Sequence, residues 1–162
     1  MKLGEGVEWA LHCATVLALV PEGQALPAAS LAEFHGVPPA YLAKTMQALA
    51  RAGIVGSVAG RRGGYCLTRR AKEITILDVV EAVEGRDPCF RCTEIRRRGP
   101  TQAPPEQYGH TCAIAEVMYR ADAAWRAELE RTTLADLLTR LAQTVPAEST
   151  VKAATWLRGA MR

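Results

Sequence analysis

Proline and glycine residues between positions 21 and 53 constrain this chain most, because they divide it into short helices. Pro21-Glu22-Gly23 ends an apolar helical pattern over about residues 4–20. Gly36 and Pro38-Pro39 then separate two further helical segments, and proline is well tolerated in the first turn of a helix. We therefore expect a helix, a tight turn and a second helix in this part of the chain.

The limits of these two short helices can be predicted. Ser30 stands three residues before Glu33, the spacing of a capping box in which a hydroxyl and a carboxylate each satisfy a free backbone amide. We expect the first helix to begin there. The second helix carries Leu42, Met46 and Leu49 at helical spacing, which predicts one buried face.

A glycine-rich basic turn follows the second helix. Ile54-Val55 and Tyr65-Cys66-Leu67 are β-prone runs on either side of Gly60-Arg61-Arg62-Gly63-Gly64, which predicts a β-hairpin. Helix, turn, helix and hairpin in this order form a winged helix-turn-helix. The expected fold class is therefore mainly α with a small β-hairpin wing.

The second helix would enter the DNA major groove by its N-terminal end. Lysine can neutralise a phosphate, glutamine can pair with a base edge, and arginine at a hairpin tip suits phosphate or minor-groove contact. The same order of elements occurs in folds that bind only proteins, so a protein adaptor is an alternative. The expected DNA-binding residues are Tyr41, Lys44, Thr45, Gln47, Arg61 and Arg62.

Charge is unevenly distributed along the chain. Residues 1–72 hold eight Lys or Arg and four Asp or Glu, a balance of +4, whereas residues 73–111 hold five and seven, a balance of −2. The positive excess lies in the N-terminal half, as expected if that half meets a polyanion such as double-stranded DNA.

The C-terminal half contains a long aperiodic segment. Residues 85–111 are rich in proline and glycine, and loops of this length are usually functional or disordered. A long amphipathic helix follows, with an apolar stripe of Val117, Ala121 and Trp125, and Thr132-Thr133 would cap a further helix. We divide the chain into a DNA-binding region (1–84), a loop (85–111), dimerisation helices (112–141) and a C-terminal tail (142–162).

The chain has five cysteines and no recognisable secretory signal. The apolar stretch near the N-terminus is interrupted by His12 and is too short to span a bilayer. We therefore expect a cytoplasmic protein without membrane contact, in which cysteines serve as ligands or redox groups more often than as disulfides. Cys13 and Cys66 lie among apolar residues and are expected in the core.

Several motifs together resemble the Rrf2 family of winged-helix transcription regulators, from about residue 3 to 140. Glu8-Trp9-Ala10-Leu11-His12-Cys13 and Cys92-Thr93-Glu94-Ile95-Arg96 look most like its iron–sulfur redox sensors of the RsrR type. The other motifs are Tyr41-Leu42, Ala52-Gly53-Ile54-Val55, Gly60-x-x-Gly63-Gly64-Tyr65, Ile74-Thr75-Ile76-Leu77-Asp78-Val79-Val80-Glu81-Ala82-Val83-Glu84-Gly85 and Thr133-Leu134-Ala135-Asp136-Leu137.

The resemblance implies a homodimer built around the long helix, with an iron–sulfur cluster, most simply [2Fe–2S]. Cys92 and Cys112 match the two cluster cysteines of the RsrR-type pattern. Glu8 and His12 stand four residues apart, so they share one face of a helix and can bind one metal ion. These two ligands would come from the other subunit. Many family members instead place three cysteines at short, even spacing, and this chain departs from that pattern.

The resemblance and the residues predict a redox-responsive repressor that binds promoter DNA. Cys89 could be a spare thiol or a substitute ligand, and His110 could compete as a ligand. Two alternatives remain: a metal-free thiol–disulfide switch, and a zinc-structured protein adaptor. We find no nucleophile–base set and no phosphate-binding loop, so an enzyme is not expected.

Overall fold

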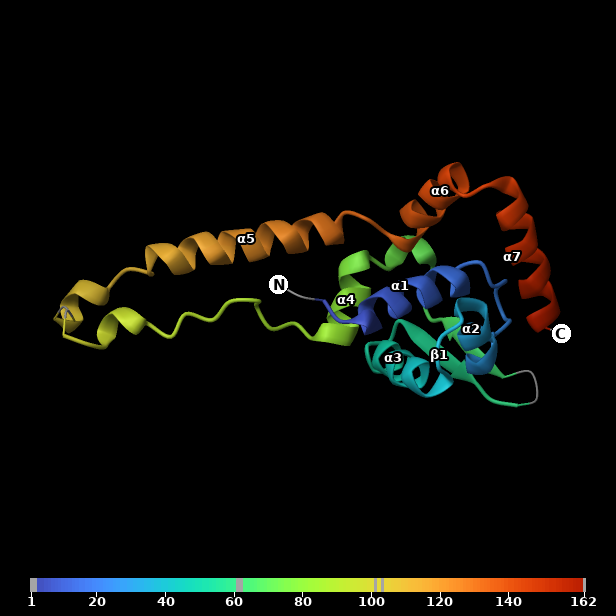
Figure 1. Cartoon of the computed structure of the whole chain (residues 1–162), viewed down its shortest axis with the longest axis horizontal. Coiled ribbons are helices and arrows are strands. Elements are labelled where there is room, and N and C mark those ends of the chain that lie inside the picture. The colour runs from blue at the N-terminus through green and yellow to red at the C-terminus, as the bar shows by residue number, and fades with distance from the viewer. Residues whose placement is uncertain (1–2, 61–62, 101, 103, 162) are drawn as a thin grey trace.

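A computed structural model describes residues 3–60, 63–100, 102 and 104–161. It has a body of helices with one hairpin, and a long arm that leaves the body (Figure 1). Within the described ranges, no helix combines the length and apolar character needed to cross a bilayer. The α-helices are α1 (Glu5–Leu17), α2 (Ala28–His35), α3 (Pro39–Arg51), α4 (Ile76–Glu84), α5 (Ala113–Glu130), α6 (Leu134–Thr144) and α7 (Ala147–Ala160). The strands are β1 (Val55–Val58) and β2 (Gly64–Leu67), and short 3₁₀ turns cover Ala71–Glu73, Ile95–Arg97 and Pro105–Tyr108.

Helices α1, α2 and α3 form the helix-turn-helix part of the body. α2 ends at Gly36, whose left-handed backbone (φ 63°) suits glycine, and α3 begins at Pro39. Leu31 of α2 and Leu42 and Leu49 of α3 are fully buried in one apolar cluster. The expected helix, tight turn and second helix are confirmed.

The expected capping box at Ser30 is wrong. α2 already begins at Ala28, and Pro27 holds the N-cap position without a side-chain cap. Leu26 and Tyr65 exchange two backbone hydrogen bonds of 2.9 and 2.8 Å, which keep the chain extended as far as Pro27. Because the helix starts directly after this bridge, Ser30 becomes an interior residue.

β1 and β2 form the expected antiparallel hairpin. Glycine fits at position 64 because a Cβ atom there would lie 2.3 Å from the backbone of Leu26. Arg61 and Arg62, which we expect at the hairpin tip, lie outside the described residues.

The arm begins where α4 ends. A capping box between Thr75 and Asp78 starts α4, and Gly85 ends it with a φ of 88°. From there to Cys112 the described residues form no α-helix or strand, as the lack of periodicity predicts. α5 then returns beside this loop toward the body (Figure 1).

Arg126 of α5 fastens the base of the arm. Its guanidinium donates to the carboxylates of Asp122 (2.8 Å) and Glu81 (2.5 Å), and to the backbone carbonyls of Arg86 (3.2 Å) and Asp87 (3.1 Å). One side chain thus joins α4, the start of the loop and α5, using the several donors of a planar guanidinium.

The C-terminal segment returns to the body. A capping box between Thr133 and Asp136 starts α6 where the sequence predicts a cap. Residues 142–162, expected as a tail, contain the end of α6 and all of α7. Leu157 of α7 is 4% exposed and belongs to the core of the body, so this segment is part of the fold.

Candidate functional site

The exposed face of α3 carries three of the expected DNA contacts. Tyr41 is 59% exposed, and Lys44 and Gln47 are exposed on the same helix. The Tyr41 ring meets Trp9 of α1 edge-on at 6.1 Å, and Lys44 Nζ lies 6.0 Å from the Tyr41 ring centroid. A phenol, an ammonium and an amide are therefore presented together, and such groups can bond phosphates and base edges.

Thr45 does not belong to this surface. It is only 6% exposed, and a Cβ atom at Gly6 of α1 would lie 3.8 Å from Thr45 Oγ1. Successive helical residues point in different directions, so α3 exposes Lys44 and turns Thr45 toward α1. We therefore remove Thr45 from the expected DNA contacts.

Cys92 and Cys112 both lie near the guanidinium of Arg96, in the arm. Arg96 donates to the carboxylate of Glu94 at 2.8 and 3.1 Å. These bonds raise the pKa of Arg96 most, and the charges of Cys112 and Cys92 raise it further. Glu94 also meets Cys92, since its backbone N–H donates to the sulfur at 3.4 Å. The Arg96–Glu94 ion pair therefore interacts with both of the thiols that the sequence predicts as ligands.

Cys112 lies at the N-cap of α5 and is 9% exposed. The backbone amides of Ala115 and Ile114 point at its sulfur and lower the pKa of the thiol, and the positive charge of Arg96 lowers it further. A helix N-terminus favours an anion in this position. These effects outweigh the opposing effect of desolvation, so the thiolate, the form that binds metal or attacks a disulfide, forms more easily at Cys112 than at an ordinary cysteine.

Arg96 also organises the loop around the two thiols. The Tyr108 hydroxyl donates to the Arg96 carbonyl at 2.7 Å, and Arg96 Nη2 donates to the carbonyl of His110 at 3.3 Å. The Tyr108 ring lies 5.4 Å from the Arg96 guanidinium and 5.2 Å from that of Arg97. The sequence allows Arg96-Arg97-Arg98 to contact DNA phosphate, to lie in the surroundings of the cluster or to be a solvated run, but it does not predict the particular partners of Arg96.

Cys89 occupies a different part of the arm. Its backbone N–H donates to Asp122 at 3.3 Å, and a hydrogen bond from its thiol to the same carboxylate raises the pKa of Cys89. Asp122 stands ten residues beyond Cys112, which corresponds to about 15 Å along a helix. The backbone N–H of Cys92 donates to the Tyr119 hydroxyl at 3.4 Å, one helical turn before Asp122, so Cys89 is remote from Cys112 but not from Cys92. Its expected role as a spare thiol or a substitute ligand stays a prediction.

Glu8 and His12 are both exposed on α1, one helical turn apart. Figure 1 places α1 in the body, whereas α5 begins at the far end of the arm. No group of three or more His, Cys, Asp or Glu side chains within the described ranges could hold a metal ion. One chain therefore does not bring all four expected ligands together.

His12 has an aromatic neighbour in α2. Its ring centroid lies 5.5 Å from that of His35. His35 is half-buried, and burial, followed by the charge of His12, lowers its pKa. Among the described side chains, its Nε2 is a buried atom without a hydrogen-bond partner. The sequence predicts only a structural role for His35.

Of the two cysteines expected in the core, Cys13 belongs to it and Cys66 lies only at its edge. Cys13 is fully buried, and burial raises the pKa of its thiol to about 12. Cys66 is half-buried, and its sulfur lies 3.9 Å from the carbonyl oxygen of Gly56. A buried neutral thiol behaves as a small apolar side chain, so Cys13 does not suit ligation.

Comparison with known families decides the class of protein. The sequence profile of the Rrf2 family, described as an iron-dependent transcriptional regulator, matches residues 3–140. The chain belongs to the Rrf2 family of transcriptional regulators. The match covers α1 to most of α6, and α7 lies beyond it.

Two curated regulators are similar to this Rrf2 protein over most of their length. The HTH-type transcriptional regulator YwgB of Bacillus subtilis is 29% identical over 143 residues, which cover 88% of each chain. The HTH-type transcriptional regulator Rv1287 of Mycobacterium tuberculosis is 32% identical over 137 residues, covering 85% of this chain and 81% of the relative. These relatives agree with the predicted class of transcriptional regulator.

Solved structures share the winged-helix fold of this Rrf2 protein. CymR, the global cysteine regulator of B. subtilis, has a TM-score of 0.69 at 24% identity, over 86% of this chain and 98% of CymR. The T. potens IscR has a TM-score of 0.68 at 21% identity, over 91% of this chain and 93% of IscR. The oxidised form of Staphylococcus aureus CymR has a TM-score of 0.61 at 27% identity, over 85% of this chain and 95% of that CymR. The predicted fold class is confirmed.

Proposed function

We propose that this Rrf2 regulator is a homodimeric repressor that binds promoter DNA and responds to redox state through a [2Fe–2S] cluster. The carrying observation is that Cys92 contacts Glu94, that Glu94 accepts from Arg96, and that Arg96 also bonds the carbonyl of His110, two residues before Cys112. Cys92 and Cys112 would bind one iron. Glu8 and His12 of the other subunit would bind the second.

The donor set fits such a group. The α5 amides favour the thiolate form of Cys112, which is the form that binds iron. Glu8 and His12 are exposed one turn apart on α1 and are therefore free to meet the arm of a second chain. When bound, a cluster with two thiolates on one iron and weaker donors on the other supplies a one-electron change at a raised reduction potential.

The link to DNA runs through α1. Trp9 lies on the same helix as Glu8 and His12, and its ring contacts Tyr41 of α3 at 6.1 Å. A displacement of α1 would therefore move the helix that carries the expected base and phosphate contacts. In a dimer, the same displacement in both subunits changes the spacing of the two α3 helices on DNA.

Iron and acid-labile sulfide analysis, with a visible spectrum of protein purified without oxygen, tests this function. We expect equal amounts of iron and sulfide and a coloured protein whose spectrum bleaches on reduction. Colourless protein that contains no sulfide, even after reconstitution with iron and sulfide, would contradict the cluster.

A metal-free thiol switch is the second candidate. The similarity to S. aureus CymR favours it, because a regulator of this fold is known in an oxidised form. Peroxide would take two electrons from Cys92 and Cys112, which would lose their two thiol protons and form one disulfide while peroxide becomes water. Mass spectrometry after peroxide treatment distinguishes the two candidates. The thiol switch requires that iron-free protein reversibly loses both thiols and that its DNA binding changes at the same time.

A further inference from the structure

A row of four aromatic rings connects α7 to the candidate ligand His12. The Trp156 ring of α7 meets Phe34 of α2 at 5.1 Å. Phe34 meets His35 at 5.0 Å, and His35 meets His12 of α1 at 5.5 Å. Each ring lies within the distance at which aromatic side chains contact each other edge to face. The C-terminal helix is therefore in indirect contact with α1.

α7 is held to the body at a small number of side chains. Leu157 is 4% exposed, and Trp156, Ala160 and Met161 pack partly against the same core. The first half of α7 stands free, since Val151 is 62% exposed. α7 thus meets α2 through the Trp156 ring, whereas Leu157 contributes packing in the core of the body.

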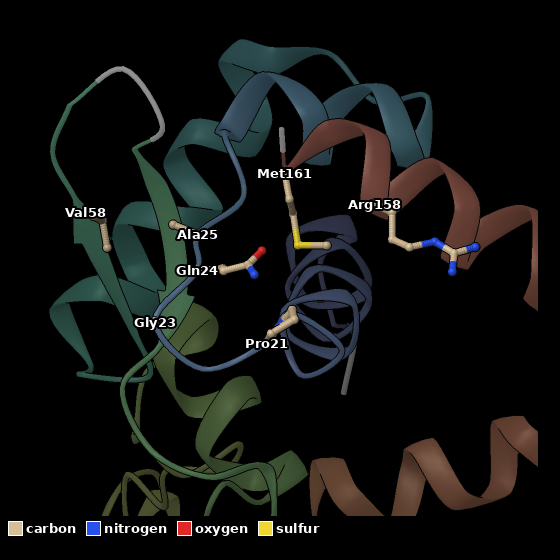
Figure 2. A pocket seen from close by; sticks show the side chains of 7 residues that line it. All are labelled: Pro21, Gly23, Gln24, Ala25, Val58, Arg158 and Met161. Atoms are coloured by element: carbon tan, nitrogen blue, oxygen red, sulfur yellow. The ribbon is translucent and has the colours of Figure 1, made fainter.

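The last turn of α7 does not close against the hairpin. A cavity of about 570 Å³ separates them, lined by Pro21, Gly23, Gln24, Ala25, Val58, Arg158 and Met161. Figure 2 shows the side chains of Gln24 and Met161 extending into this hollow, whereas the guanidinium of Arg158 points away. Because a cavity separates α7 from the hairpin, the hairpin does not fix the position of α7. The contact between Trp156 and Phe34 is therefore more important for this position.

We propose that Trp156 is a positioning residue for His12, acting through Phe34 and His35. An exposed side chain on a helix samples several rotamers unless a neighbour restricts it, and His35 is such a neighbour for His12. His35 ends α2 directly after Phe34, so the placement of its ring depends on the Phe34 ring against which it packs. Trp156 packs edge-on against the Phe34 ring at 5.1 Å and thereby limits its movement.

This inference extends the family pattern, because α7 lies outside the matched residues 3–140. It rests on the proposed function only in giving His12 the role of a ligand. The ring-to-ring contacts themselves belong to the single chain and do not require a cluster. They can therefore be tested in full-length protein with and without iron.

The test compares Trp156→Ala, Trp156→Phe and Leu157→Ala. In iron-free full-length protein, the ring signals of His12 and His35 in NMR spectra report their surroundings, because neighbouring aromatic rings shift them. We expect Trp156→Ala to shift and broaden both pairs of signals, and Trp156→Phe to restore them. Leu157→Ala removes core packing without removing a ring, so it should lower the melting temperature while leaving these signals in place.

In iron-loaded protein the same variants should differ in the midpoint potential of the cluster and in the rate at which the cluster is lost. Trp156→Ala should change the midpoint potential of the cluster and speed its loss several-fold, and Trp156→Phe should restore both. Ring signals unchanged in Trp156→Ala, or moved equally by Leu157→Ala, would overturn the positioning role of Trp156. Wild-type protein without iron and sulfide would instead overturn the proposed function, whatever the ring signals do.

Discussion

Cys112 combines two local effects that act on one sulfur atom. The amides of Ala115 and Ile114 lower the pKa of its thiol, and Arg96 lowers it further. Cys89 experiences the reverse effect, because the carboxylate of Asp122 disfavours a second negative charge beside it. Two thiols on the same arm are therefore distinct in chemistry as well as in position.

The ligand assignment predicts different results for three cysteine substitutions. Cys92→Ala or Cys112→Ala should abolish the visible chromophore, because loss of one of two thiolates exposes the cluster to hydrolysis. Cys89→Ala should leave the chromophore nearly intact and serves as the matched control. Absorption spectra and iron content check this, and loss of colour in Cys89→Ala would move the assignment to a different cysteine set.

Arg96 should control the reactivity of Cys112 in iron-free protein. Arg96→Gln removes a positive charge, so the pKa of Cys112 should rise toward its ordinary value, although the α5 amides still hold it down. The alkylation rate of Cys112 by iodoacetamide should then fall several-fold near neutral pH, and its pH midpoint should move upward. Arg97→Gln is the control, since Arg97 also meets the Tyr108 ring. An unchanged midpoint in Arg96→Gln would mean that the guanidinium does not act on this thiol.

Individual residues could be predicted where spacing alone defines them. Glu8 and His12 share a helix face because they stand four residues apart, and the structure exposes both. A place near the cluster was one of the roles that the sequence allows for Arg96, but its partners could not be predicted, because the fold of the loop brings Glu94 and the His110 carbonyl to its guanidinium. Thr45 was placed on the DNA surface by its polarity, whereas helix packing against α1 decides that it is buried.

Elements were predictable where local chemistry defines their ends. Gly36 and Pro39 limit α2 and α3 without help from distant residues. Ser30 shows the opposite case, because a bridge between Leu26 and Tyr65, 39 positions apart, decides where α2 begins. A local sequence pattern cannot predict this pairing of two distant residues.

α7 was missed because its local signal is weak. Residues 147–160 expose most side chains, and only a short stripe including Trp156 and Leu157 faces the body. Helices with so narrow an apolar face have little periodicity to detect. The tryptophan was the available signal, since a large aromatic side chain in a polar tail usually has a packing partner.

The α3 helix and the hairpin should contribute to DNA binding in different ways. Gln47→Ala should relax preference at particular base pairs, at a cost of about 1–3 kcal/mol for the preferred sequence. Arg61→Ala with Arg62→Ala should weaken binding to all sequences and reduce the slope of log affinity against log salt by about two. Binding titrations on matched and scrambled promoter DNA at several salt concentrations measure both. An unchanged affinity of the double arginine variant would remove the hairpin from the interface.

At the scale of the whole molecule, the expected ligands are divided between two regions. Glu8 and His12 lie on α1 in the body, whereas Cys92 and Cys112 lie in the arm (Figure 1). The sequence could predict this division only through the family resemblance, because no local pattern places the arm relative to α1. The proposed site therefore requires a second chain, and the arm of each subunit would reach the body of the other.

The exposed face of α5 is the surface on which that second chain should pack. Several apolar side chains on it are exposed in the single chain, and a surface helix rarely shows so many without a partner. They are Ile114 (69%), Val117 (53%), Met118 (40%) and Tyr119 (41%).

Val117→Glu should therefore give monomers that also lack the cluster. A carboxylate at the centre of an apolar interface loses its hydration without gaining a partner, a cost of several kcal/mol that a dimer of moderate stability does not survive. Val151→Glu makes the same substitution on the exposed first half of α7, where the side chain is 62% exposed, and should remain dimeric and coloured. Light scattering and iron analysis on the same samples measure both properties. A Val117→Glu monomer that keeps its full iron content would contradict a site shared between subunits, because one chain would then supply every ligand.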